Sequence, residues 1–167
     1  EVMVNVRDVM TEAPKSVQDS DNLVHVARVM RDEDVGWVPV VDSGGKLLGT
    51  LTDRDLVVEA LAANDNPNIR QAGDMLRGGV QTVDAGSPST KAVETMGRSR
   101  IRRLPVVEGG RLVGVVGVAD LAKNLPSAAV GELMGEWDEW PARAGGDADD
   151  AAAQAELDSN AGREEAS

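Results

Sequence analysis

The sequence reads Trp37-Val38-Pro39-Val40-Val41 followed by Gly49-Thr50-Leu51-Thr52-Asp53-Arg54-Asp55, and it reads again Arg103-Leu104-Pro105-Val106-Val107 followed by Gly114-Val115-Val116-Gly117-Val118-Ala119-Asp120. The two prolines stand 66 residues apart and the two leading glycines 65, so the second copy has lost one loop residue. An internal repeat of this kind indicates a structural unit that was duplicated and packs against its copy. Because the polar residues of the copies differ, we expect one competent ligand site and one degraded site.

Each copy has the pattern of a β-α-β-β-α unit. In the first copy, residues 15–17 form a short strand, and Asn22 caps a helix whose apolar residues recur at i, i+3, i+4 and i+7. A hairpin with its turn at residues 43–45 follows, and Thr52 begins a second helix with Leu56, Val57, Ala60 and Leu61 on one face. Helices then cover one face of each sheet, so the other face needs its twin. The predicted fold is a mixed α/β (α+β) fold of two such repeats with pseudo-twofold symmetry.

These patterns divide the chain into five segments. We expect the first repeat at residues 1–63, a linker at 64–71, the second repeat at 72–126, an amphipathic helix at 127–140 and a disordered acidic tail at 141–167. The helix at 127–140 has Val130, Leu133, Met134 and Trp137 at helical spacing. Such a stripe packs against the body or a twin subunit, or it binds a separate partner.

Composition limits the possible functions. The 167 residues are 41% hydrophobic and include no cysteine and a single histidine, His25, which argues against disulfides, metal sites built on thiolates or histidines, and a Cys nucleophile. No apolar run reaches the roughly 18 residues of a membrane span, and we expect a cytoplasmic protein without membrane contact. The net charge is −12, and residues 136–167 hold ten acidic and two basic residues, so nonspecific binding to nucleic acid is not expected.

The segment from Gly49 to Asp55 is the candidate ligand site. A strand ends there and a helix begins, and the free N–H groups of a first helical turn suit a phosphate. The Thr52 hydroxyl and the Arg54 guanidinium can contact phosphate oxygens, while the Asp55 carboxylate can accept bonds from two ribose hydroxyls. Gly49 would leave room for a close approach. The alternative is that Thr52 and Asp55 form a capping box and serve only the helix.

The second copy bears on this choice. Asp120 retains the acid there while Gly117 removes the hydroxyl, and a capping box would not need its acid once the hydroxyl is gone. A ribose-binding carboxylate would still be useful, although an acid in a first turn also interacts favourably with the helix dipole.

Two further features adjoin the repeated strands. Four arginines lie between residues 98 and 103, where the first copy has acidic residues, glycine and Trp37. Such a run is usually solvated, but it could also pair with the opposite charges of the other half or of another subunit, contact a polyphosphate, or bind nucleic acid. The Trp37 indole can stack on a purine or fill the core.

No enzyme signature is present. The chain has no Gly-x-Ser-x-Gly sequence and no Walker-type phosphate loop, and Asp53 and Asp55 point in different directions on a helix. We therefore expect no catalytic residue and no metal site.

These motifs resemble the CBS domain, named for cystathionine β-synthase, present as a tandem pair or Bateman module. The resemblance covers residues 5–126. Within the family, the chain is similar to small stand-alone bacterial CBS-pair proteins. It implies an adenine-nucleotide sensor without a catalytic cofactor, and commonly a disc-like homodimer.

The resemblance also implies which residues bind. In the first site Thr52 and Asp55 contact phosphate and ribose, with the base enclosed by Ser16, Val17, Val38 and Pro39. The second site has Asp120 with Thr82, Val83, Leu104 and Pro105, and Gly117 departs from the motif there. Arg102 and Arg103 match a position that meets phosphates in some members.

The leading hypothesis is a regulatory module that binds AMP, ADP, ATP or a related adenosyl ligand and changes conformation or assembly. The alternative is a structural dimerisation or interaction protein that presents its C-terminal helix and tail and has vestigial ligand sites. Nucleotide hydrolysis is a third, remote hypothesis.

Overall fold

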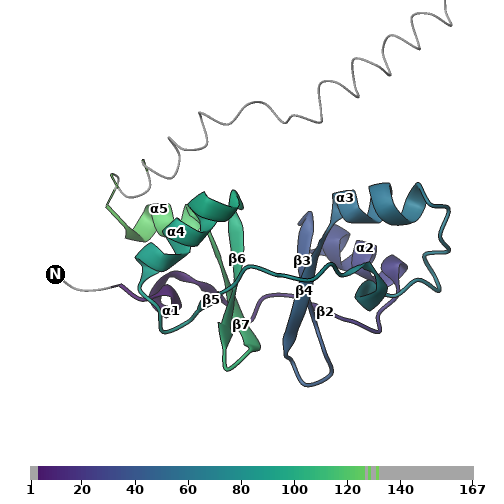
Figure 1. The fold of residues 1–167 in the computed structure, drawn as a ribbon, viewed down its shortest axis with the longest axis horizontal. Helices are drawn as coiled ribbons and strands as arrows, with labels where there is room; N and C mark the ends of the chain where they lie inside the picture. Colours follow the sequence, from purple (N-terminus) through teal and green to yellow (C-terminus); the bar gives the residue numbers. More distant parts are fainter. Residues whose placement is uncertain (1–3, 127, 129–130, 132–167) are drawn as a thin grey trace, which may run out of the picture. The chain divides into compact units, whose positions relative to one another are not determined.

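The computed structural model describes residues 4–126, 128 and 131 (Figure 1). All of them fall in the compact unit Glu1–Leu133. The predicted helix at 127–140, apart from two isolated residues, and the predicted tail at 141–167 lie outside the described residues and stay predictions.

The first repeat has the predicted order of elements. It consists of β2 (Val17–Gln18), α2 (Leu23–Asp32), β3 (Trp37–Val41), β4 (Leu47–Thr52) and α3 (Asp53–Asp55), which continues directly into η1 (Leu56–Leu61). Strand β3 pairs in parallel with β2 and antiparallel with β4. Asn22 Oδ1 accepts a hydrogen bond of 2.9 Å from the amide of His25, which confirms the predicted cap.

The second repeat has the same plan. After η2 (Ala72–Met75), it consists of β5 (Val83–Asp84), α4 (Ser89–Ser99), β6 (Arg103–Glu108), β7 (Arg111–Gly117) and α5 (Val118–Asn124). Both hairpins shift register at the same place, between Val40 and Val41 and between Val106 and Val107. The repeat seen in the sequence is therefore a repeat of backbone geometry, down to an equivalent irregularity.

The segment that precedes each repeat in the sequence packs against the other repeat. Helix α1 (Val6–Val9) and strand β1 (Thr11–Glu12) come before the first repeat, but β1 joins the sheet of the second, whose order is β1-β7-β6-β5. The amide of Val6 donates to the carbonyl of Ser87 (2.9 Å). Figure 1 shows α1 beside the second repeat, although it is coloured as the start of the chain.

The converse holds for η2, which precedes the second repeat and bonds to the first. The amides of Ala72 and Gly73 donate to the carbonyls of Asp21 and Asp19, at 2.8 Å each. Ala72 and Met75 are buried in the core of the first repeat. Each repeat thus completes its packing with a segment that the sequence places ahead of the other.

The two hairpin turns are also bonded to each other. The amide of Leu47 donates to the carbonyl of Gly110 (3.0 Å), and the amide of Leu112 donates to the carbonyl of Gly45 (3.1 Å). These two bonds join the two sheets at their turns.

Helix η1 carries on one face the four apolar residues that were predicted there, and all of them line one groove beside α2. Ala60 is buried, but Val57 and Leu61 on the same face are 56% and 68% exposed. The amide of Ala62 donates to the carbonyl of Val57 and that of Asp65 to that of Ala60, each at 3.0 Å. Bonds that span five residues widen the helix locally. The four predicted apolar residues nevertheless share the face that lines the groove.

Two strand glycines make room for the exchanged segments. A Cβ built on Gly49 would lie 2.7 Å from Leu76 Cδ2, and a Cβ on Gly114 would meet the sulfur of Met10. Leu76 follows η2 and Met10 follows α1, so the two contacts are equivalent in the two halves. The space at Gly49 that was expected to admit a ligand is therefore occupied by a side chain of the chain itself.

We predict that Gly49→Ala destabilises the protein, because the added methyl group must displace Leu76 from the sheet. The expected loss in the free energy of unfolding is about 1–3 kcal/mol, measured by urea denaturation. The control is Gly78→Ala, since a Cβ there has no atom within 4 Å. That variant should change stability by less than about 1 kcal/mol. Equal losses in the two variants would contradict the packing described.

Candidate functional site

The turn between β4 and α3 holds Thr52 and Asp55 in a reciprocal pair of hydrogen bonds. The amide of Thr52 donates to Asp55 Oδ2 (2.8 Å), and the amide of Asp55 donates to Thr52 Oγ1 (3.2 Å). This is the capping box that was considered as an alternative to a ligand site. Both side chains are partly exposed, so the structure places a hydroxyl and a carboxylate together at an accessible helix start.

Trp37 lies directly across from this turn. The register of β3 and β4 pairs Trp37 with Thr52, and the amide of Asp53 donates to the carbonyl of Gly36 (3.0 Å). The Trp37 residue is partly exposed, whereas the next residue, Val38, is 1% exposed. The first repeat therefore brings an indole, a hydroxyl and a carboxylate to the same end of its sheet. Arg54, in the same turn, is exposed.

The corresponding turn of the second repeat has a different set of groups. The amide of Gly117 donates to Asp120 Oδ2 (2.8 Å), so the acid caps the helix without help from a hydroxyl. The inference that Asp120 would have no capping role after the loss of the hydroxyl is wrong, because the carboxylate serves a backbone N–H. The presence of Asp120 therefore does not by itself indicate a ribose site.

Arg102 and Arg103 belong to this second turn. The register of β6 and β7 pairs Arg103 with Gly117, in the place that Trp37 has in the first repeat. The amide of Val118 donates to the carbonyl of Arg102 (3.2 Å), as that of Asp53 does to Gly36. A Cβ built on Gly117 would lie 3.4 Å from Asp120 Oδ2 and 3.8 Å from Arg103 Cγ. The second repeat thus has the Arg103 guanidinium where the first has the Trp37 indole. It has Gly117, without a side chain, where the first has the Thr52 hydroxyl.

The residues expected around the base divide into two groups. Ser16 and Thr82 are partly exposed, whereas the others are buried: Val17, Val38, Pro39, Val83, Leu104 and Pro105. Val17 and Val38 belong to the apolar core of the first repeat. The side chains of these two residues therefore face the core, and their backbone is the part that remains for a ligand.

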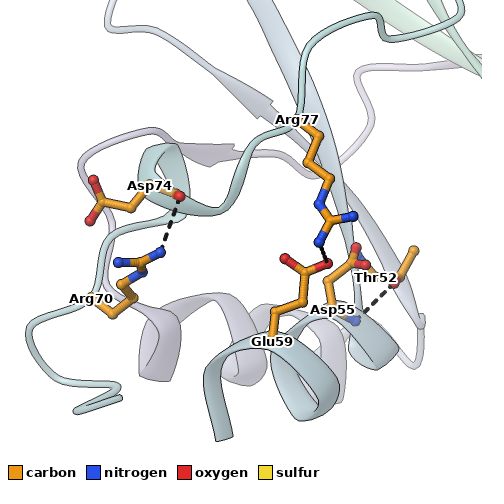
Figure 2. A network of polar contacts seen from close by, with 6 residues as sticks. All are labelled: Thr52, Asp55, Glu59, Arg70, Asp74 and Arg77. Carbon is orange, nitrogen blue, oxygen red and sulfur yellow. Dashed lines mark hydrogen bonds and ion pairs between the residues drawn. The ribbon is translucent and has the colours of Figure 1, made fainter. Parts of the chain in front are cut away.

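A polar network from the segment between the repeats adjoins the first turn (Figure 2). Arg77 Nη2 lies 2.7 Å from Glu59 Oε1, and Glu59 stands one helical turn beyond Asp55. Arg70 Nη2 donates to the carbonyl of Asp74 (3.3 Å), and its Nε lies 3.6 Å from Asp65 Oδ2. Sequence spacing did not reveal Glu59 or Arg77, because their contact joins two segments that only the fold brings together.

A second feature is an apolar groove on the helices of the first repeat, with a volume of about 460 Å³. It is lined by Leu23, Val24, Ala27, Arg28, Arg31, Leu56, Val57, Ala60, Leu61, Asp65 and Pro67. At its rim Arg31 Nε donates to Asp32 Oδ1 (2.8 Å), and this hydrogen bond, with the charge of Arg31, lowers the pKa of Asp32. The groove is built from α2 and η1.

Two other kinds of feature are absent from residues 4–126, 128 and 131. No group of three or more His, Cys, Asp or Glu residues in this part of the chain could hold a metal ion. No helix among the same residues is both long and apolar enough to cross a membrane.

Comparison with known proteins agrees with this geometry. Hypoxic response protein 1 of Mycobacterium tuberculosis (strain ATCC 25618 / H37Rv) is 37% identical over 132 residues, which are 79% of this chain and 92% of that protein. A crystal structure of Hypoxic Response Protein I with two coordinated zinc ions has a TM-score of 0.69 at 36% identity, over 74% of this chain and all of the other.

Two more distant structures share the fold and contain adenosyl compounds. The CBS domain pair of protein MJ0100, in complex with 5-methylthioadenosine and S-adenosyl-L-methionine, has a TM-score of 0.62 at 24% identity and covers 73% of this chain and 95% of its own. CBSX2 in complex with AMP has a TM-score of 0.61 at 23% identity, over 71% and 93% of the two chains. The sequence model of the CBS domain matches residues 6–61 and again 72–127. The chain therefore belongs to the CBS domain family and contains two CBS domains in tandem.

Proposed function

We propose that this chain is a regulatory module that binds an adenosyl nucleotide and responds by a change in conformation or assembly. The observation that carries the proposal is the turn at Thr52 and Asp55, where a hydroxyl, a carboxylate and the start of a helix lie together opposite Trp37. Support also comes from CBS domain pairs that contain AMP, 5-methylthioadenosine or S-adenosyl-L-methionine. The proposal assigns no catalytic step to the chain.

Different residues of the site suit the ribose, the phosphate and the base of the ligand. Asp55 Oδ1 can accept ribose hydroxyls while Oδ2 keeps the amide of Thr52, and Thr52 and Arg54 can donate to phosphate. Ser16 and the backbone of Val17, Val38 and Pro39 would enclose the base, with the Trp37 indole available for stacking. A ligand that binds one conformation of the chain more tightly than another shifts the population toward that conformation, to the extent of its difference in affinity.

The second turn is proposed as the weaker site. Asp120, with Thr82, Val83, Leu104 and Pro105, has no hydroxyl equivalent to that of Thr52. Arg102 and Arg103 supply positive charge beside Gly117 instead. This set favours an anionic group over a ribose, so the two turns should differ in affinity.

We predict that Asp55→Asn weakens AMP binding about tenfold or more, because the amide offers one acceptor oxygen and no charge to the ribose. Isothermal titration calorimetry measures this change. The matched control is Asp120→Asn, which alters an equivalent cap bond of 2.8 Å and should weaken binding by less than about threefold. Both variants should lower the melting temperature by similar amounts. AMP binding that is absent from the unmodified protein, or unchanged in Asp55→Asn, would contradict the proposal.

The second candidate function is dimerisation, and the apolar groove favours it. Val57 and Leu61 are more than half exposed, and both line the groove between α2 and η1. Arg28 and Arg31 lie on its α2 side and Asp65 on the other, so two copies related by a twofold axis can match opposite charges. We propose that this face of the first repeat pairs with the same face of a second copy.

Leu61→Glu is expected to convert a dimer into a monomer, because it places a charge in the proposed apolar contact. Size-exclusion chromatography with light scattering measures the mass. Ile69→Glu is the control, since Ile69 is 73% exposed and lies outside the groove. A monomeric unmodified protein, or equal dissociation by both substitutions, would argue against this surface.

A further inference from the structure

Arg77 is held near the first turn by an ion pair with Glu59 of η1. Its Nη2 lies 2.7 Å from Glu59 Oε1, and its side chain is 81% exposed while that of Glu59 is 29% exposed. Figure 2 shows the guanidinium reaching from the segment between the repeats to the helix that carries Asp55 and Glu59. A cation from a distant part of the sequence thus reaches the helix that begins at the proposed ligand site.

Glu59, the partner of Arg77, places a second carboxylate near that of Asp55. It follows Asp55 by four residues in one continuous helical segment, and Figure 2 shows both carboxylates on the side of this segment that Arg77 approaches. A ribose held by Asp55 would bring a 5′-phosphate into a region with two negative side chains. An uncharged adenosyl compound would not meet this repulsion, whereas a phosphorylated one gains from a cation beside the two carboxylates in addition to Arg54.

Arg77 can leave Glu59, or contact a ligand phosphate as well as Glu59, at a small cost in free energy. Exposed ion pairs contribute little to stability, and a guanidinium has five N–H donors, so Arg77 can contact a phosphate while it keeps or leaves Glu59. Charge-assisted bonds from arginine to phosphate are among the strong hydrogen bonds of proteins.

The residues on either side of Arg77 allow such a movement. Leu76, before it, packs where a Cβ on Gly49 would be, which fixes one end. Gly78 and Gly79, after it, have no atom within 4 Å of a built Cβ, and Gly79 has a φ of +91°. Arg77 therefore lies between a packed residue and two unpacked glycines, where the backbone can adjust without loss of core contacts.

We propose that Arg77 determines the preference of the first site for phosphorylated over uncharged adenosyl ligands, with Glu59 as the partner that holds it there when no phosphate is bound. The inference rests on the proposed function and adds to it a specificity residue from outside the repeated motif.

The test is the ratio of the affinities for AMP and adenosine, measured by isothermal titration calorimetry on the full chain. Arg77→Ala should weaken AMP binding about tenfold or more and adenosine binding by less than about threefold. Glu59→Gln should leave AMP binding unchanged or make it tighter. Lys91→Ala is the control, because Lys91 also forms an exposed ion pair, with Glu94 of the second repeat (3.5 Å), and should leave the ratio unchanged.

Each other outcome overturns the inference in a recognisable way. Equal losses for AMP and adenosine in Arg77→Ala and Glu59→Gln would show that the ion pair only fastens the segment between the repeats. If the ratio of the affinities for AMP and adenosine is the same in Arg77→Ala as in the unmodified protein, the phosphate lies away from Arg77. The inference would then be wrong, while the proposed function would stand. Failure of the unmodified protein to bind either compound would overturn the proposed function together with this inference.

Discussion

The exchange of the two leading segments is the constraint on which the rest of the described structure depends. The core of the first repeat contains Ala72 and Met75, which the sequence places ahead of the second. The sheet of the second repeat gains β1 from the start of the chain. Because each repeat buries apolar surface supplied by a segment beyond its own β-α-β-β-α unit, neither can be removed without exposing the core of the other. The strand glycines Gly49 and Gly114 follow from the same constraint, since they are the places where Leu76 and Met10 come to rest.

The proposed ligand site is a consequence of that packing. Leu76 fixes the path of the connecting segment, and the next residue, Arg77, reaches the helix that begins at Thr52 and Asp55. The two turns then differ through their side chains on a common backbone. The first has an indole and a hydroxyl where the second has a guanidinium and no side chain. A duplicated fold can in this way provide two positions with different side-chain chemistry on a common backbone.

The sequence predicted the elements well because their signals are local. The cap at Asn22, the two hairpins and the tandem family resemblance all depend on residues that are close in the chain, and each is confirmed. The exchange of segments was not predictable in this way, because a repeat period does not say which copy a leading segment packs on. The shared apolar face of η1 was predicted, but the spacing of its residues does not say whether another segment covers that face, and Val57 and Leu61 are exposed on it. Asp120 was misjudged because a carboxylate can cap a helix alone, and Arg77 was missed because its partner lies in another segment. The binding roles of the site residues stay predictions.

Amide hydrogen exchange on the full chain, with and without AMP, tests most directly whether the connecting segment and the first turn act as one ligand-responsive unit. The account predicts that saturating AMP slows exchange at residues 52–55 and at residues 76–79 together, because the ligand engages the turn and draws on Arg77. Slower exchange confined to the second repeat, or no change in either segment while AMP is bound, would contradict it.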